Sequence, residues 1–208
     1  AGALDNAEDV GNLQYLASTA REAGLSTRVI DINALNLQDG VFYDPSGEKV
    51  ERCFKLYPWE WMVDESPDGC MADVQWVEPI WKLVMSNKAI LTTLFELFPD
   101  SPYVLPAFLS RPQNGVYCKK PVYAREGHNV SVLDIRNWEE RVLVPETEGD
   151  YNRGAYIYQQ YVEPTVYDGR YPIIGSWIIG GEAGGIGIRE NCTEITDNLS
   201  AFVPHIIG

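Results

Sequence analysis

The chain has 208 residues, with 16 Lys and Arg against 30 Asp and Glu, so its formal net charge is −14. A nucleic-acid-binding protein neutralises phosphates with a basic surface, so this charge argues against such a partner and equally against an anionic membrane surface. The composition of 45% hydrophobic and 22% charged residues is that of a folded globular protein, and the length permits one or two domains.

Targeting and redox signals are weak. No apolar run reaches the roughly 20 residues that a membrane helix needs, and the first residues lack a basic start and an apolar signal core, which predicts a cytoplasmic protein. The four cysteines include no C-x-x-C pair, so we expect reduced thiols. The two histidines have no ligand spacing around them, which argues against a histidine metal site.

The first elements follow from capping and periodicity. Asn6 is placed to cap a helix that continues to Gly24, because apolar residues recur on one helical stripe between them. Residues 26–32 alternate like a strand. An α/β unit normally begins with a strand, so a helix followed by a strand is an unusual opening.

The next segment is rich in aromatic residues. The turn at 44–47 predicts a hairpin between residues 41–43 and 49–54. The aromatic segment 54–62 is interpreted as a core or subdomain contact, because Trp and Tyr bury large areas. We expect residues 66–73 to form an exposed acidic loop.

The middle of the chain changes from helix to strand. Residues 78–98 carry apolar side chains at helical spacing, as one helix or as two helices around Ser86 and Asn87. Residues 116–122 read as a strand, 123–129 as a turn that contains glycine, and 130–135 as the returning strand.

The last part is predicted to be mostly β structure. The acidic segment 139–150 is interpreted as a solvated loop and residues 155–162 as a further strand. Residues 171–179 and 185–189 flank a Gly-rich segment at 180–184, which predicts a hairpin.

The hairpin around Lys120 is the most informative stretch for chemistry. A strand that carries Lys120 and is followed by a turn with Gly127 places an ammonium beside backbone N–H groups that can wrap a phosphate chain. The alternative is an ordinary surface hairpin in which Lys119 and Lys120 are solvated edge residues, and no Walker A sequence is present. By spacing alone, Lys88 is a solvated lysine.

Two other positions have weaker signals. The strand 155–162 ends at a proline bend, where the backbone could present N–H and C=O groups to an adenine edge, although by itself it is only a strand end. Arg189 closes an apolar strand and could steady the charge of a transferring phosphoryl group. It could equally form an ion pair with Glu190 or Asp197.

Nine short strings occur in an order that resembles the glutathionylspermidine synthase family, most strongly from about residue 50 to the end. They are FKLYPWE (54–60), EPxWK (78–82), SNKA (86–89), VLPA (104–107), KPxxxREGxNVS (120–131), QQY (159–161), GSW (175–177), AGGIGIRE (183–190) and FVPH (202–205). The resemblance implies an α+β protein with the ATP-grasp fold, in which two α+β lobes enclose ATP. It also implies a carboxylate that is activated as an acyl phosphate before an amine attacks it.

The same resemblance implies substrates and domains. The acid would be a glutathione-like peptide and the amine a polyamine such as spermidine, with ATP and Mg²⁺ as cofactors. Residues 1–75 would form a pre-grasp-like region on the substrate side, and residues 76–208 the nucleotide-binding region of the ATP-grasp fold.

The resemblance assigns roles to single positions. Lys88 and Lys120 are similar to two lysines that contact nucleotide phosphates. Arg189 resembles the arginine near the transferring phosphate. The flexible loop over the phosphates and the hinge against adenine are implied by two further groups, Arg125, Glu126, Gly127 and Asn129 for the loop and Gln159, Gln160, Tyr161 and Val162 for the hinge.

The chain departs from the family pattern in one respect. Family members carry an upstream Glu-Asn-Asn-Ala-Asp-type segment and an Arg-x-Asp segment that supply magnesium ligands, and neither occurs here. The chain therefore resembles a C-terminal half that is incomplete at its N-terminus, with metal ligands expected outside it. The alternatives are a non-catalytic nucleotide-binding or regulatory remnant, and an unrelated acidic interaction domain. An exposed Trp-rich surface would favour self-association.

Overall fold

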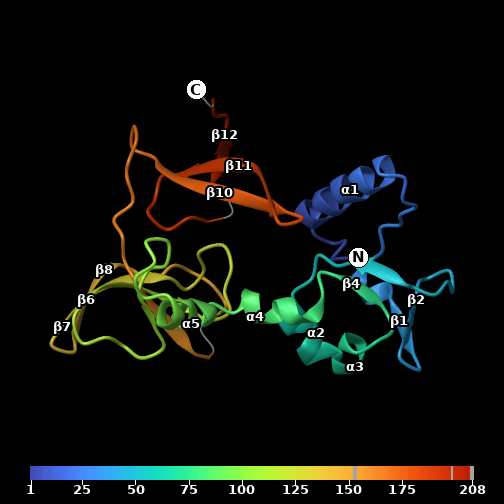
Figure 1. Ribbon diagram of the computed structural model, residues 1–208, viewed down its shortest axis with the longest axis horizontal. Coiled ribbons are helices and arrows are strands. Elements are labelled where there is room, and N and C mark those ends of the chain that lie inside the picture. The colour runs from blue at the N-terminus through green and yellow to red at the C-terminus, as the bar shows by residue number, and fades with distance from the viewer. Residues whose placement is uncertain (152–153, 198, 207–208) are drawn as a thin grey trace. The chain divides into compact units, whose positions relative to one another are not determined.

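The computed structural model describes residues 1–151, 154–197 and 199–206 and contains both helices and several β-sheets (Figure 1). It divides into two compact units, Ala1–Ser86 and Asn87–Gly208. The mixed α and β composition confirms the coarse fold class. The separate roles predicted for residues 1–75 and 76–208 stay a prediction. In the described part of the chain, no helix is long and apolar enough to cross a membrane.

The first unit opens with the capped helix that the sequence predicts. Helix α1 spans Ala7–Glu22, and the Asn6 side chain accepts hydrogen bonds from the backbone N–H groups of Glu8 and Asp9. The strand predicted at 26–32 is wrong, because this segment has no ladder partner apart from an isolated bridge between Gly2 and Asp31. A short 3-10 helix, η1 (Ile32–Ala34), follows it.

The small sheets of the first unit pair differently from the expected hairpin. Strand β2 (Val41–Tyr43) pairs with β1 (Asn36–Gln38), and β3 (Arg52–Phe54) runs parallel to β4 (Gln75–Val77). The predicted hairpin is confirmed only next to its turn, where Tyr43 and Lys49 form a bridge and the Val50 N–H donates to the Phe42 carbonyl at 2.8 Å, and it is wrong for residues 52–54. Strand β3 instead pairs with β4, which brings the buried Cys53 beside the buried Trp76.

The core of the first unit is built from the aromatic segment. Helix α2 (Trp59–Glu65) buries Trp59, whose ring packs edge-on against Trp76 with centroids 5.7 Å apart. The core interpretation of this segment is confirmed. The exposed loop predicted at 66–73 is wrong, because α3 (Pro67–Cys70) forms there and buries Gly69 and Cys70. The cluster comprises Phe42, Cys53, Trp59, Met62, Cys70, Ala72 and Trp76.

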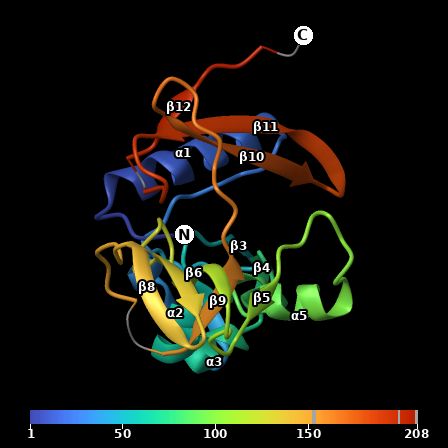
Figure 2. The same ribbon diagram turned by 90° about the vertical axis from the view of Figure 1, so that its left-hand side faces the viewer.

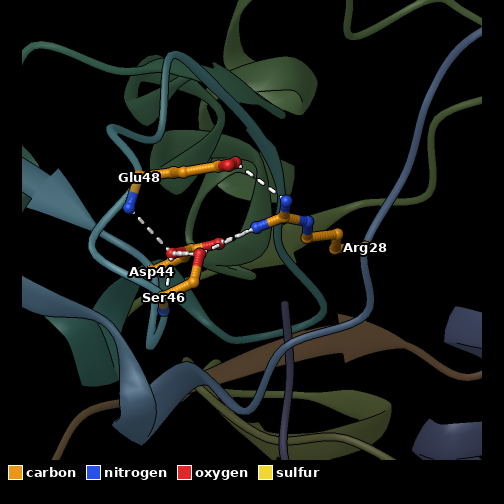
Figure 3. A network of polar contacts seen from close by, with 4 residues as sticks. All are labelled: Arg28, Asp44, Ser46 and Glu48. Atoms are coloured by element: carbon orange, nitrogen blue, oxygen red, sulfur yellow. Dashed lines mark hydrogen bonds and ion pairs between the residues drawn. The ribbon is translucent and has the colours of Figure 1, made fainter.

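A polar clamp ties the segment after α1 to the turn after β2 (Figure 3). The Arg28 guanidinium donates to the Asp44 carboxylate and lies 2.9 Å from the Glu48 carboxylate. Asp44 also accepts from the Ser46 hydroxyl and from two backbone N–H groups, and the Ser46 bond contributes most to lowering the pKa of Asp44 to about 2. The clamp thus stabilises the 44–48 turn as a closed unit.

The apolar stretch at 78–98 forms separate helices. The 3-10 helix η2 (Ile80–Lys82) leads into α4 (Leu83–Ser86), and α5 (Ile90–Leu97) follows after a break at Asn87. The alternative of two helices around Ser86 and Asn87 is confirmed. The Asn87 side chain accepts from the Ala89 backbone N–H at 2.8 Å, which stabilises the turn between the two helices.

The second unit contains a five-stranded antiparallel sheet in the order β5-β9-β6-β7-β8. Figure 2 labels β5, β6, β8 and β9 of this sheet. Its strands are β5 (Ala107–Phe108), β6 (Gly115–Pro121), β7 (Ser131–Arg136), β8 (Glu139–Val144) and β9 (Tyr156–Gln160). The strands predicted near β6, β7 and β9 are confirmed. The loop predicted at 139–150 is wrong over β8, because an edge strand tolerates exposed charges that resemble a loop pattern.

A three-stranded antiparallel sheet completes the second unit. Strand β10 (Tyr171–Ile179) and β11 (Glu182–Asn191) form the predicted hairpin, and β12 (Ala201–Val203) pairs with β11. Gly180 and Gly181 both have positive φ at the hairpin turn, which explains the glycines there.

Candidate functional site

Lys120 lies on β6, an interior strand of the five-stranded sheet, so it is not the solvated edge residue of the alternative interpretation. Its ammonium donates a hydrogen bond of 2.8 Å to the Gln159 side-chain oxygen on the neighbouring strand β9. Burial lowers the pKa of Lys120, because desolvation disfavours the charged form. Lys119 points to the opposite face of the sheet and lies 4.3 Å from the Tyr156 ring centroid.

Lys88 reaches the same end of β6. Its backbone N–H donates to the Val122 carbonyl at 2.8 Å, and its ammonium donates to the Ala124 carbonyl. The segment 122–124 directly follows β6, the strand that carries Lys120. The structure therefore places both predicted phosphate-binding lysines at the entrance to the turn at 125–129.

The turn at 125–129 is closed by a bond from the His128 N–H to the Arg125 carbonyl at 2.9 Å. Glu126, Gly127 and Asn129 all have positive φ within it. Asn129 is buried, and its side-chain oxygen accepts from the Tyr151 N–H at 2.8 Å. The Asn129 amide thus braces the turn from within.

The glycine of this turn is required by a close backbone approach. Gly127 has φ +72°, and a Cβ atom on residue 127 would lie 2.0 Å from the Thr196 carbonyl oxygen. Only glycine combines this conformation with this contact. Gly127 therefore allows the segment 193–197 to pack directly against the turn.

Backbone N–H groups of the predicted hinge donate hydrogen bonds to carbonyl groups of the same chain. The Gln160 N–H donates to the Pro106 carbonyl at 2.7 Å, and the Tyr161 N–H donates to the Val116 carbonyl at 2.9 Å. The Tyr161 hydroxyl donates to the Glu194 carboxylate at 2.9 Å, and burial together with this bond raises the pKa of Tyr161 to about 12. Val162 follows β9 and is exposed. Adenine contacts through the N–H groups of Gln160 and Tyr161 would compete with these bonds.

A pocket of about 600 Å³ opens beside the turn. It is bounded by residues 126–128, 144, 147–148, 171 and 193–197, which bring together parts of both sheets and the segment before β12. Among the described residues of this lining, none is Lys or Arg. Four carboxylates line it instead, Glu126, Glu148, Glu194 and Asp197.

Sequence reasoning missed most of this pocket. Of the lining residues, only Glu126 and Gly127 were among the predicted site residues. Glu148 lies in the segment interpreted as a solvated loop, and Glu194 and Asp197 had no motif around them. These acidic residues were visible in the sequence, but contacts of Gly127 with the Thr196 carbonyl and with the Thr147 hydroxyl bring their two segments to the same turn.

Arg189 lies apart from this pocket. It sits on β11 between the register positions of Ile173 and Phe202, and its guanidinium is 6.0 Å from the Phe202 ring centroid. It is not among the residues that line the pocket. In the described part of the chain, Arg189 forms no ion pair with Glu190 or Asp197. Its role beside a phosphate stays a prediction.

The described residues are better suited to binding phosphate groups than to binding a metal ion. Two ammonium groups near the turn, those of Lys88 and Lys120, are chemically suited to phosphate oxygens. Within the described ranges, no group of three or more His, Cys, Asp and Glu side chains is placed to hold a metal ion. The expectation that magnesium ligands lie outside this chain stays a prediction.

Comparison with known proteins defines the family. The family model described as glutathionylspermidine synthase preATP-grasp matches residues 1–208. A putative acid–amine ligase from Haemophilus influenzae is 37% identical over 207 residues, which cover 95% of this chain and 53% of that protein.

More distant relatives match over the same region. Trypanothione synthetase from Crithidia fasciculata is 29% identical, with 95% of this chain and 34% of the relative covered. A bifunctional glutathionylspermidine synthetase/amidase from Escherichia coli is 26% identical, with 96% and 36% covered. The chain thus spans between a third and about half of the length of these relatives. By its match to the family model along its whole length, the chain belongs to the glutathionylspermidine synthase family.

Proposed function

We propose that this chain is the nucleotide- and amine-binding portion of an ATP-dependent carboxylate–amine ligase with the ATP-grasp fold. The ligase would join a glutathione-like peptide to a polyamine-like amine. One observation carries the proposal: the half-buried Lys120 ammonium lies on the strand that leads into the turn at 125–129, and an acidic pocket is lined by residues of the same turn. Membership of a family whose relatives are named as ligases and synthetases supports it.

The cationic side suits the nucleotide. Lys120 and Lys88 would each donate a hydrogen bond from the side-chain ammonium to a phosphate oxygen, and a charged hydrogen bond of this kind contributes about 1.5–3 kcal/mol. Lys120 is held in place by Gln159, so its side chain is ordered before the nucleotide arrives. ATP, when bound, supplies the phosphoryl group that activates the carboxylate of the acid.

The acidic side suits the amine. The carboxylates of Glu126, Glu148, Glu194 and Asp197 line the pocket, where they attract an ammonium group and repel unshielded phosphates. A volume of about 600 Å³ lies within the range of small-molecule sites, roughly 300–1,000 Å³. The proposal therefore assigns the phosphates to the lysines that precede the turn at 125–129 and the amine to the carboxylates of the pocket beside it.

Calorimetric titration of ATP, with and without magnesium, tests the nucleotide site. We expect Lys120→Ala to weaken ATP binding at least tenfold and Lys119→Ala, on the opposite face of β6, to leave it within about twofold. Equal binding by Lys120→Ala and the wild type would refute the assignment. Binding that depends on Lys120 but ignores magnesium would favour a non-catalytic nucleotide-binding remnant over a ligase.

A further inference from the structure

The Tyr161 side chain joins the predicted hinge to the acidic pocket. The Tyr161 backbone N–H donates to the Val116 carbonyl on β6 at 2.9 Å, which fixes this residue to the five-stranded sheet. Its hydroxyl donates to the Glu194 carboxylate at 2.9 Å, 33 positions later in the chain. Glu194 follows β11 and is one of the four carboxylates that line the pocket. A single hydrogen bond therefore links the hinge, proposed for the nucleotide, to the pocket, proposed for the amine.

The Glu194 carboxylate also lies within electrostatic reach of the sheet face that carries Lys120. Cys118 and Lys120 are two positions apart on β6, so their side chains share that face. Burial raises the pKa of the Cys118 thiol, the Lys120 ammonium opposes this rise, and the Glu194 carboxylate adds to it. One thiol is therefore influenced both by the proposed phosphate-binding ammonium and by a carboxylate of the amine pocket.

This arrangement gives the two ligands a physical reason to bind cooperatively. A nucleotide brings several negative charges to Lys120, and the Glu194 carboxylate repels them. An ammonium group bound at Glu194 offsets this repulsion, and phosphates bound at Lys120 in turn strengthen the attraction for the ammonium. Glu194 is exposed and lies in a segment outside the helices and strands, so its bond to Tyr161 decides where its charge is held.

We propose that Tyr161 is a positioning residue, which holds the Glu194 carboxylate beside the hinge and thereby makes nucleotide and amine bind cooperatively. The inference rests on the proposed function, because it needs a nucleotide at the hinge and an amine in the pocket. By thermodynamic linkage, the factor by which the nucleotide raises the affinity for the amine equals the factor by which the amine raises the affinity for the nucleotide.

Calorimetric titration of spermidine into the chain measures this factor, in the absence and in the presence of magnesium and a saturating β,γ-imido analogue of ATP. We expect the analogue to tighten spermidine binding at least about fivefold in the wild type. In Tyr161→Phe we expect a change of less than about twofold, because the unanchored carboxylate is free to turn into solvent. The factor is a ratio of two dissociation constants of one protein, so a general loss of affinity in the variant cancels from it.

Tyr57→Phe is the matched control, because the Tyr57 hydroxyl donates to the Glu65 carboxylate in the first unit. This variant loses the same kind of bond and should keep the wild-type factor. Glu194→Gln should lose the factor as Tyr161→Phe does, because the hydroxyl then holds no charge. Attraction between spermidine and the nucleotide in free solution is the same in every titration series and does not distinguish the variants. Circular dichroism checks that each variant is folded.

Two results would overturn this inference alone. One is a spermidine affinity that the nucleotide analogue changes less than about twofold in the wild type although both ligands bind. The other is a factor that Tyr161→Phe and Tyr57→Phe leave equally intact while both variants are folded. A wild type that fails to bind the nucleotide or spermidine would refute the proposed function, and this inference with it.

Discussion

The Lys120 ammonium and the Gln159 side-chain oxygen lie 2.8 Å apart on adjacent strands, although the two residues are 39 positions apart in the chain. The pair joins the strand before the glycine turn to the strand that leads into the predicted hinge. A residue proposed for phosphate contact and one proposed for adenine contact are therefore held together by a direct bond.

The close approach at Gly127 predicts a specific loss of stability. Gly127→Ala should destabilise the second unit by about 2 kcal/mol or more, because the new methyl group meets the Thr196 carbonyl in addition to the cost of a positive φ. Gly169 has a similar φ of +75° but open space around it, so Gly169→Ala should cost only about 1 kcal/mol. Urea unfolding compares the two variants. Equal losses would show that the contact with Thr196 is unimportant.

The acidic pocket predicts binding of cations. Glu194→Gln with Asp197→Asn should weaken spermidine binding to the chain at least tenfold, because two of the four carboxylates that line the pocket are neutralised. Glu182→Gln with Glu139→Gln changes the net charge equally outside the pocket and serves as the control. Calorimetry at two salt concentrations measures both. If the control variant loses as much affinity, the attraction comes from overall charge and not from the pocket.

Buried Lys55 predicts a pH dependence at alkaline pH. Its side chain is 8% exposed, its ammonium lies 3.8 Å from the Trp59 ring centroid, and burial lowers the pKa of Lys55 to about 8. Between pH 8 and the usual pKa of 10.5 the unfolded chain binds the proton more tightly, so the free energy of unfolding should rise with pH there.

The comparison with Lys55→Met isolates this effect, because the variant cannot titrate at residue 55. From pH 7.5 to pH 10, the wild type should gain up to about 3 kcal/mol relative to Lys55→Met in urea unfolding. Parallel pH profiles for the two proteins would contradict the assigned cause.

The clamp at Asp44 predicts a dependence of the same sign at acidic pH, with the free energy of unfolding rising as the pH rises from about 2 to 3.8. Its pKa is lowered to about 2, so its contribution to stability is complete above the usual value of 3.8 and is lost as the pH falls toward 2. Replacing Arg28 by Gln should reduce the free energy of unfolding at pH 6 and shrink its change between pH 4 and pH 2. The control, Lys49→Gln, removes an ion pair with Asp73 in which both side chains are exposed and should have little effect. Unfolding curves that respond equally to both substitutions would argue against the clamp.

Features that depend on near neighbours in the chain were predictable. The Asn6 cap, the break at Asn87 and the hairpin at Gly180 and Gly181 follow from hydrogen bonds or backbone angles within a few residues. The family resemblance was also visible, because it rests on short strings and needs no knowledge of their contacts.

Features that depend on distant partners were decided by the tertiary structure. Strand β8 has a charge pattern typical of a loop and becomes a strand only because β7 lies beside it. The acidic pocket forms where Gly127 meets Thr196, 69 positions later in the chain. Periodicity records which residues prefer burial or exposure, but pairing depends on which segments meet in space, and no local pattern contains that information.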